Sequence, residues 1–528
     1  MLGLFSMWRI SGLAVLAVGL CLQLVYSAAG QGSARPNVVL IFADDLGFGD
    51  VSSYNPDSRI RTPNLDRLAT EGIQMTDAHS ASAVCTPSRY ALLTGRYSWR
   101  TELKSGVLGG FSLPLIEPGR MTLGDLFKQR DYATACIGKW HLGMEWDRPH
   151  RGEQEYAMRQ KWESVDFSNR IQKTPTSNGF DTFFGISASL DMPPYVFIEN
   201  DRVVELPTSM LEFEDKGGRP GPASPGWRHK YVTGAIIDKT IEFISDHRNE
   251  PFFAYVPLNS PHTPHAPADA FNGTSGLDAY GDFVVEVDHH VGRVMQALSD
   301  FRQAENTLLI VTSDNGPETN MYDRLQQTGH DSSGLLLGSK RDNWEGGHRV
   351  PFIARWPGLI PAGAVNSDLF CLVDLMATFA DLLDLEVPED QGADSVTALP
   401  LLKGENGDYR ESHAIIHHSS SGRFAIRSGD WKLLLHSGSG GNNYSVKSGR
   451  RAMAYAGTLE QRLFDTGDRQ LYNLRLDMAE SQNLASEHPD MVAELTKLAT
   501  EYVKNGRGTP GPRQEYVAGD LPQIEWVE

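Results

Sequence analysis

The amino-acid sequence predicts an α/β protein: a large mixed, mostly parallel sheet sandwiched by helices, with a smaller α+β domain that contains an antiparallel sheet. Strand-like and helix-like runs alternate along most of the 528 residues, which is typical of α/β layers. Several strand-like runs are continuously apolar, as expected of strands that are buried on both faces. After about residue 405 the pattern changes to short hairpin-like runs. We therefore expect one domain over 35–405 and a second over 406–528.

Four continuous apolar runs are the predicted buried strands of the first domain, at 37–43, 133–137, 252–258 and 307–312. Amphipathic helices are predicted between them, because apolar residues recur three or four positions apart in polar surroundings. The residues with this spacing are Ile237, Ile241 and Ile244, and further on Phe283, Val287, Val291, Val294 and Leu298.

The second domain contains a predicted β-hairpin at 423–435, which turns at 428–430. Residues 470–474 have the composition of another strand, and 491–503 that of a closing helix. These elements together predict a small antiparallel sheet with a helix beside it.

Residues 1–30 are predicted to be a secretory signal peptide. Arg9 supplies the positive charge, 10–26 is nearly all apolar, and 27–30 offers small residues for cleavage. A retained membrane anchor is the alternative, but the apolar run is shorter than the ~20 residues that a spanning helix needs. A lipoprotein anchored through Cys21 is a further, minor alternative. The protein is therefore expected to be exported, to the periplasm or the medium.

The charge balance limits the classes of partner. The formal net charge is -19, which argues against a nucleic-acid ligand. An anionic substrate is compatible with this charge only if cationic side chains and a metal ion dominate the field inside the pocket.

The cysteines do not form a disulfide framework. Beyond the signal segment the chain keeps Cys85, Cys136 and Cys371, which is too few for a disulfide-rich exported protein of this length. Cys136 and Cys371 could pair with each other or stay buried as small hydrophobic residues. Their apolar surroundings favour burial.

Chemically active side chains follow each of the four predicted buried strands. In open α/β sheets, ligands bind outside the carboxyl ends of the strands. The strand ends therefore predict one shared site. Its side chains are Asp44 and Asp45, Lys139 and His141, His262, and Asp314 and Asn315.

Four of these side chains are candidate metal ligands. Asp44, Asp45, Asp314 and Asn315 offer hard oxygen donors, which suit Ca²⁺ or Mg²⁺ better than Zn²⁺. Adjacent ionised aspartates repel each other, so a buried pair needs a cation. Taken alone, Asp-Asp and Asp-Asn-Gly are equally compatible with solvated turns.

The segment from Cys85 to Arg96, CTPSRYALLTGR, is the most specific motif in the chain. Pro87 and Ser88 suit the first turn of a helix, which would place Cys85 at the helix start, where partial positive charge favours an anion. A buried structural cysteine is the plain alternative. At every fixed position the segment resembles the signature of type I sulfatases, C-x-P-S-R-x-x-x-L-T-G-R.

The resemblance implies a chemistry for Cys85. In type I sulfatases, members of the alkaline phosphatase-like superfamily, a maturation enzyme oxidises this cysteine to formylglycine. One hydroxyl of the hydrated aldehyde then attacks a sulfate ester. The family holds one Ca²⁺ through residues that match Asp44, Asp45, Asp314 and Asn315 and through the formylglycine, with Arg89 beside them.

The resemblance also implies roles for four further residues. Lys139 and His141 lie in GKWHLG, where the lysine binds sulfate and the histidine hydrogen-bonds the hydrate and helps to remove its proton. His262 would be the general acid for the leaving alcohol, with His265 as a rival. Lys340, five residues before Glu345, would contact the sulfate and the bridging oxygen.

The substrate class follows from a weaker likeness. Residues 271–294 resemble a stretch of arylsulfatase A and N-acetylgalactosamine-6-sulfatase, which implies a sulfated carbohydrate, with galactose-type sugars favoured, or an aryl sulfate. Loops 187–195 and 323–333 would line the pocket. Asp191, His330 and Asp331 are candidate sugar contacts, although ordinary loop polarity explains them equally well.

Two other functions compete with this one. A phosphodiester or phosphonate monoester hydrolase of the same superfamily could use the same nucleophile. An exported glycan-binding protein could carry an unconverted Cys85, but a binding protein has no need of a general acid such as His262.

Overall fold

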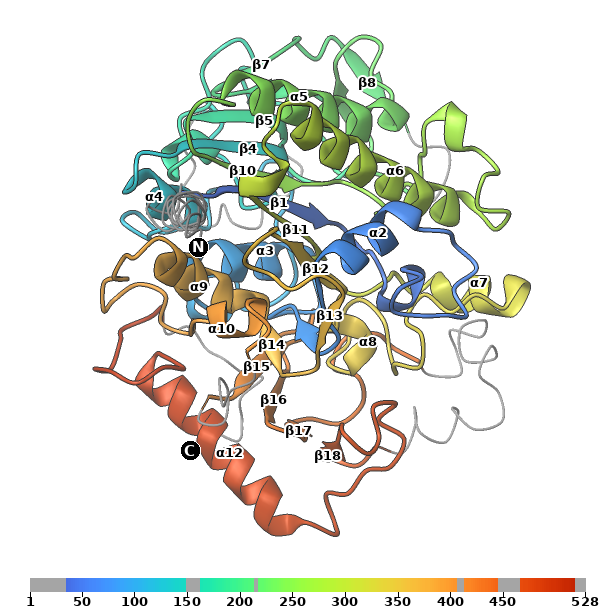
Figure 1. Ribbon diagram of the computed structural model, residues 1–528, viewed down its shortest axis with the longest axis vertical. Coiled ribbons are helices and arrows are strands. Elements are labelled where there is room, and N and C mark those ends of the chain that lie inside the picture. Colours follow the sequence, from blue (N-terminus) through green and yellow to red (C-terminus); the bar gives the residue numbers. More distant parts are fainter. Residues whose placement is uncertain (1–34, 149–161, 213–216, 406–412, 445–465, 518–528) are drawn as a thin grey trace, which may run out of the picture. The chain divides into compact units, whose positions relative to one another are not determined.

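The computed structural model describes residues 35–148, 162–212, 217–405, 413–444 and 466–517 (Figure 1). The predicted signal peptide lies outside these ranges, and the predicted domain boundary at 405 and 406 borders one of the gaps. Among the described residues, no helix is both long and apolar enough to cross a membrane. The described residues from Asn37 onward belong to one compact unit.

A ten-stranded mixed sheet forms the centre of this unit, as the fold class predicted. Its five middle strands run parallel, and all four predicted buried strands are among them. They are, in spatial order, β11 (Thr307–Ser313), β1 (Asn37–Ala43), β10 (Phe252–Pro257), β4 (Ala133–Lys139) and β5 (Thr182–Ile186).

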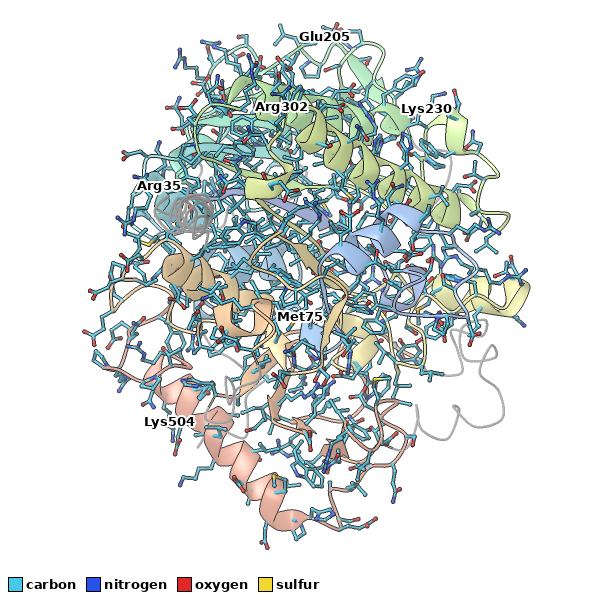
Figure 2. The ribbon with its side chains drawn as sticks, in the orientation of Figure 1. Arg35, Met75, Glu205, Lys230, Arg302 and Lys504 are labelled. Carbon is cyan, nitrogen blue, oxygen red and sulfur yellow. The ribbon has the colours of Figure 1, made fainter. Side chains whose placement is uncertain are left out.

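Short strands extend both edges of this parallel centre through antiparallel pairings, apart from the outermost strand of one edge, which pairs parallel. Beyond β11 lie β12 (Phe352–Arg355), β2 (Ile73–Met75) and β13 (Ala364–Asn366), and beyond β5 lie β6 (Ile198–Glu199) and β7 (Arg202–Val203). Met75 of β2 lies deep among the packed side chains in Figure 2, whereas the exposed Glu205 and Lys504 lie at the periphery.

Helices cover both faces of the sheet, and successive side chains of β1 alternate between the two faces. Val38, Leu40 and Phe42 point into one hydrophobic core, and Val39 and Ile41 into the other, so the whole strand is apolar. The first core includes α3 (Cys85–Thr94), α4 (Leu123–Lys128) and α9 (Leu375–Leu382). The second includes α2 (Pro63–Glu71), α5 (Val232–Asp246) and α6 (Ala279–Asp300).

The C-terminal part forms a four-stranded antiparallel sheet with α12 (Pro489–Asn505) beside it (Figure 1). The predicted hairpin is confirmed, since Ser428 pairs with Trp431 across the turn. Tyr97 and Trp99 share one hydrophobic core with this sheet and with α12, so the core joins the two parts. The strands are β15 (Ile415–His418), β16 (Phe424–Ser428), β17 (Trp431–Leu434) and β18 (Gln470–Asn473).

Shorter elements complete the described chain. Cys136 and Cys371 are buried as small hydrophobic residues. The remaining strands and α-helices among the described residues are β3 (Ala78–His79), β8 (Ser209–Leu211), β9 (Gly221–Ala223), β14 (Phe370–Cys371), α7 (Met321–Thr328), α8 (Glu345–His348) and α10 (Leu399–Leu402).

Arg100 and Asp394 form a buried ion pair, and Arg100 also contacts α12. Arg100 donates from Nε and Nη2 to the two carboxylate oxygens of Asp394, at 3.0 and 2.7 Å, and from Nη1 to the carbonyl of Tyr502 at 3.1 Å. Both charged side chains of the pair are fully buried. The guanidinium also stacks on Trp99, 4.1 Å from the ring centroid.

We predict that Asp394→Ala lowers the free energy of unfolding by about 3–5 kcal/mol, because it leaves the Arg100 charge buried without a partner. Urea denaturation measures this change. Asp201→Ala is the matched control, since it breaks the exposed pair between Asp201 and Arg170, and we expect it to cost about 1 kcal/mol or less. Equal losses in the two variants would contradict the prediction.

Candidate active site

The carboxyl ends of β11, β1, β10 and β4 lie next to one another at one edge of the central sheet. Hydrogen bonds continue past the strands: the amide of Asp314 donates to the carbonyl of Ala43 at 3.1 Å, and that of Asp44 to Ser260 at 3.0 Å. Lys139 is the last residue of β4. The polar residues that follow these strands therefore converge, as the strand pattern predicted.

Three buried carboxylates and three buried cations lie together at this edge. None of the six side chains has an exposed fraction above 5%. Each carboxylate has its own cation, which offsets the cost of burying isolated charges. The pairs, with their N···O distances, are Lys139–Asp44 at 2.6 Å, Lys340–Asp45 at 2.7 Å and Arg89–Asp314 at 2.8 Å.

The two carboxylates that flank Arg89 have opposite pKa shifts. Burial and the neighbouring Asp44 carboxylate raise the pKa of Asp314 to about 7. Burial also disfavours the charge on Asp44, but Lys139 and the other nearby cations outweigh it and hold the pKa of Asp44 well below its usual range. The protein alone therefore does not fully compensate three negative charges here, and a cation would favour ionisation of Asp314.

Oxygen atoms without partners mark where such a cation fits. Asp44 Oδ1 and Asn315 Oδ1 are buried and accept no hydrogen bond. One potential ligand atom from each of Asp44, Asp314 and Cys85 lies within 4.8 Å of the other two. Asp45, Asp44 and His262 form a second such group. Two of the three ligand atoms in each group are carboxylate oxygens, which suit a hard cation such as Ca²⁺ or Mg²⁺.

Cys85 is the first residue of α3 and is only 3% exposed. The helix start favours negative charge at this position. Burial nevertheless raises the pKa of the Cys85 thiol, against the effect of Lys139 and Lys340. An unmodified thiol here is largely protonated at neutral pH and is a weak nucleophile.

The structure distinguishes His262 from its rival His265. Nδ1 of His262 lies 3.1 Å from Ser189 Oγ and 2.5 Å from the carbonyl of Thr263, and Nε2 lies 3.7 Å from Asp45 Oδ2. Nε2 of His262 is therefore directed at the carboxylate cluster. Nε2 of His265 is buried without a partner, and burial together with Arg324 lowers the pKa of His265 to about 4. His265 is thus uncharged at neutral pH.

His141 is held as a neutral imidazole. Burial and the neighbouring Lys139 charge keep the pKa of His141 well below its usual range. Its Nε2 lies 2.8 Å from the carbonyl of Leu108, so Nε2 carries the proton and Nδ1, which has no partner, is a free acceptor. Its φ of 58° lies in the left-handed region.

The three candidate sugar contacts have different surroundings. Asp191 pairs with Arg219 at 2.6 Å through Oδ2, while its Oδ1 is buried without a partner. Both ring nitrogens of His330 are engaged inside the protein, by Asp50 and by the amide of Arg59, and His330 is fully buried. Asp331 accepts hydrogen bonds from the amide and hydroxyl of Ser333.

Sequence reasoning missed three polar residues near the cluster. Ser189 contacts the catalytic candidate His262, and Glu318 forms a bidentate ion pair with Arg341, the residue after Lys340. Arg341 and Glu318 lie close to motif residues in the sequence, and Ser189 lies in the loop 187–195 that was predicted to line the pocket. Sequence reasoning did not single them out, because single polar residues in loops follow no periodic pattern.

Comparison with known proteins gives consistent matches. The chain matches the model of the Sulfatase family over residues 36–385, more than half of its length. It is 34% identical to N-acetylgalactosamine-6-O-sulfatase of Bacteroides thetaiotaomicron, over 90% of this chain and 95% of that protein. It is 35% identical to Arylsulfatase A of Bos taurus, over 78% of this chain and 77% of that protein.

Solved structures agree with these matches. One from Bacteroides thetaiotaomicron, described under the metabolism of multiple glycosaminoglycans, aligns with a TM-score of 0.74 and 32% identity, over 88% of this chain and 99% of that one. A sulfatase from Pseudoalteromonas sp. aligns with a TM-score of 0.68 and 26% identity, over 94% of each chain.

Proposed function

The chain belongs to the sulfatase family, whose members are sulfuric ester hydrolases, and we propose that it hydrolyses sulfate esters of a carbohydrate after Cys85 has been converted to formylglycine. One observation carries the proposal: Cys85 opens α3 beside Lys139, Lys340 and the carboxylates of Asp44 and Asp314. N-acetylgalactosamine 6-sulfate is the first substrate to test, since a relative that matches along most of the chain is named for that activity.

With a bound Ca²⁺, the proposed site would combine an excess of positive charge with a general acid and a proton acceptor. Formylglycine hydrate supplies the attacking hydroxyl, and a bound Ca²⁺ supplies positive charge against the sulfate oxygens. Lys139 and Lys340 bind those oxygens and stabilise the charge that builds up during transfer. His262 donates a proton from Nε2 to the leaving oxygen, and Nδ1 of His141 accepts the proton that must leave the hydrate.

The metal would be held by Asp44, Asp45, Asp314 and Asn315 together with the residue at position 85. The unpartnered oxygens of Asp44 and Asn315 and the raised pKa of Asp314 support this assignment. Arg89 keeps Asp314 in position through two hydrogen bonds. The local positive charge also accounts for binding of an anion by a protein of net charge -19.

The sugar is proposed to extend from the leaving oxygen past His262 toward Asp191. Asp191 Oδ1 accepts no hydrogen bond, so it is the proposed acceptor for a sugar hydroxyl, and Ser189, two residues earlier, contacts His262. His330 is left out of this proposal because both of its ring nitrogens are already bonded. Export of the chain and a maturation enzyme that acts on Cys85 complete the proposed function.

The mass of the tryptic peptide 68–89 tests the proposed nucleophile. For protein made beside a formylglycine-generating enzyme, we expect one oxygen in place of one sulfur and two hydrogens at Cys85. The same protein should release sulfate from N-acetylgalactosamine 6-sulfate. An intact cysteine in protein that is nevertheless active would contradict the proposed nucleophile. Faster turnover of an aryl phosphodiester than of the matching aryl sulfate would contradict the proposed reaction.

The role of His262 predicts a dependence on the leaving group. For His262→Gln, we expect kcat/KM for the sugar sulfate to fall about 10²–10⁴-fold, because an alcohol leaves poorly without a proton. The loss for 4-nitrophenyl sulfate should be much smaller, since nitrophenolate leaves unprotonated. His265→Gln is the matched control, and it should change kcat/KM by the same factor for both substrates. Equal losses for both substrates in His262→Gln would remove its role as an acid.

Metal removal should lower the stability of the folded protein. We expect Ca²⁺ added to EDTA-treated protein at about 100 times its Kd to stabilise it by about 2.7 kcal/mol, seen as a rise of several degrees in Tm. Asn315→Leu should reduce this rise, because it removes an oxygen ligand without changing the charge. Asp374→Asn is the control, because Asp374 is a buried acid outside the proposed ligand set whose Oδ1 accepts a hydrogen bond from the amide of Val396. This variant should retain the rise in Tm. An equal rise in both variants would contradict the ligand set.

A further inference from the structure

A charged pair at the edge of the site has no part in the reaction described above. Arg341 donates from Nη1 and Nη2 to the two oxygens of Glu318, both at 2.6 Å. The amide and hydroxyl of Thr319 also donate to Oε1 of Glu318 at 2.8 Å. The side chains of Arg341 and Glu318 remain 36% and 14% exposed.

The pair lies beside the groups that are proposed to act on the substrate. Arg341 directly follows Lys340, and its amide donates at 2.7 Å to the carbonyl of Ala83, two residues before Cys85. Glu318 comes three residues after Asn315. Between residues 336 and 350, Arg341 is the one residue that is not buried. Arg341 is therefore the part of this segment that reaches solvent, and its side chain pairs there with Glu318.

The backbone holds Arg341 in an unfavourable conformation. Its φ is 87°, in the region that favours glycine. Neighbouring contacts fix it there: its carbonyl accepts from the amide of Ser420 at 3.1 Å, and the carbonyl of Lys340 accepts from Asn442 Nδ2 at 2.8 Å. Strained backbone that the surroundings impose in this way is concentrated at functional sites.

We propose that Arg341 and Glu318 determine substrate specificity by binding neutral hydroxyl groups of the sugar that carries the sulfate, an inference that rests on the proposed function. Lys340 and His262 approach Asp45 at 2.7 and 3.7 Å, so the leaving oxygen lies near both. Arg341 directly follows Lys340, so a sugar on that oxygen that reaches toward Asp191 can also present hydroxyl groups to the pair.

The charge of the pair distinguishes hydroxyl groups from a second anion. Glu318 already neutralises the guanidinium through two hydrogen bonds, so a second sulfate or a carboxylate would also face the Glu318 carboxylate. A sugar hydroxyl can instead donate to Glu318 and accept from Arg341. The pair thus selects for the sugar rather than for additional negative charge.

Binding to inactive protein tests the inference independently of turnover. Calorimetry on Cys85→Ala protein, titrated with N-acetylgalactosamine 6-sulfate, gives a reference Kd. Adding Arg341→Gln or Glu318→Gln should weaken binding about 10- to 100-fold, because a hydrogen bond to a charged group is lost. Arg293→Gln is the matched control, since Arg293 is 34% exposed and pairs with Asp238 at 2.7 Å; it should leave Kd unchanged.

Inorganic sulfate is the second probe, and Arg341→Gln should weaken its binding much less than that of the sugar sulfate. Equal weakening for both probes, or unchanged binding of the sugar sulfate by Arg341→Gln and Glu318→Gln, would overturn the inference. Cys85→Ala protein that fails to bind the sugar sulfate would overturn it too. In that case 4-nitrophenyl sulfate turnover by the mature protein shows separately whether the sulfatase activity stands.

Discussion

The pairing of three buried carboxylates with three buried cations at one sheet edge is the constraint on which the rest of the site depends. Parallel strands bring Asp44, Asp45 and Asp314 together, and such a group of like charges is unstable away from water unless cations accompany it. Arg89, Lys139 and Lys340 come from a helix, a strand end and a loop. Each of these elements must therefore be in place for the buried carboxylates to be neutralised.

The C-terminal sheet contributes none of the proposed catalytic residues, yet it holds the loop that carries Lys340. Asn442 donates to the carbonyl of Lys340 and to Asp342, and Tyr444 donates to Asp342. Lys432 of β17 lies 2.9 Å from Glu345, which opens α8. These buried polar contacts are specific in direction, so they fix the loop more tightly than apolar packing alone.

The sequence predicted the fold class and the shared site because continuous apolar runs identify buried parallel strands and polar residues mark their ends. The hairpin around Ser428 followed in the same way from turn residues between two apolar runs. The short antiparallel strands β12 and β2 were not predicted, since strands of three or four residues carry little periodicity. The pairs Lys139–Asp44 and Arg341–Glu318 were missed because ion pairs between distant loops leave no pattern in the sequence.

The burial of α3 constrains the order of events while the protein is made. All ten residues of this helix are buried in the folded chain, including Cys85 and Arg89. If Cys85 is converted as proposed, an enzyme could not reach the thiol in the folded chain, so it would have to act before the helix is enclosed between the central sheet and the C-terminal sheet. The proposed modification would therefore compete kinetically with folding, and a chain that folds first would retain its thiol until it unfolds.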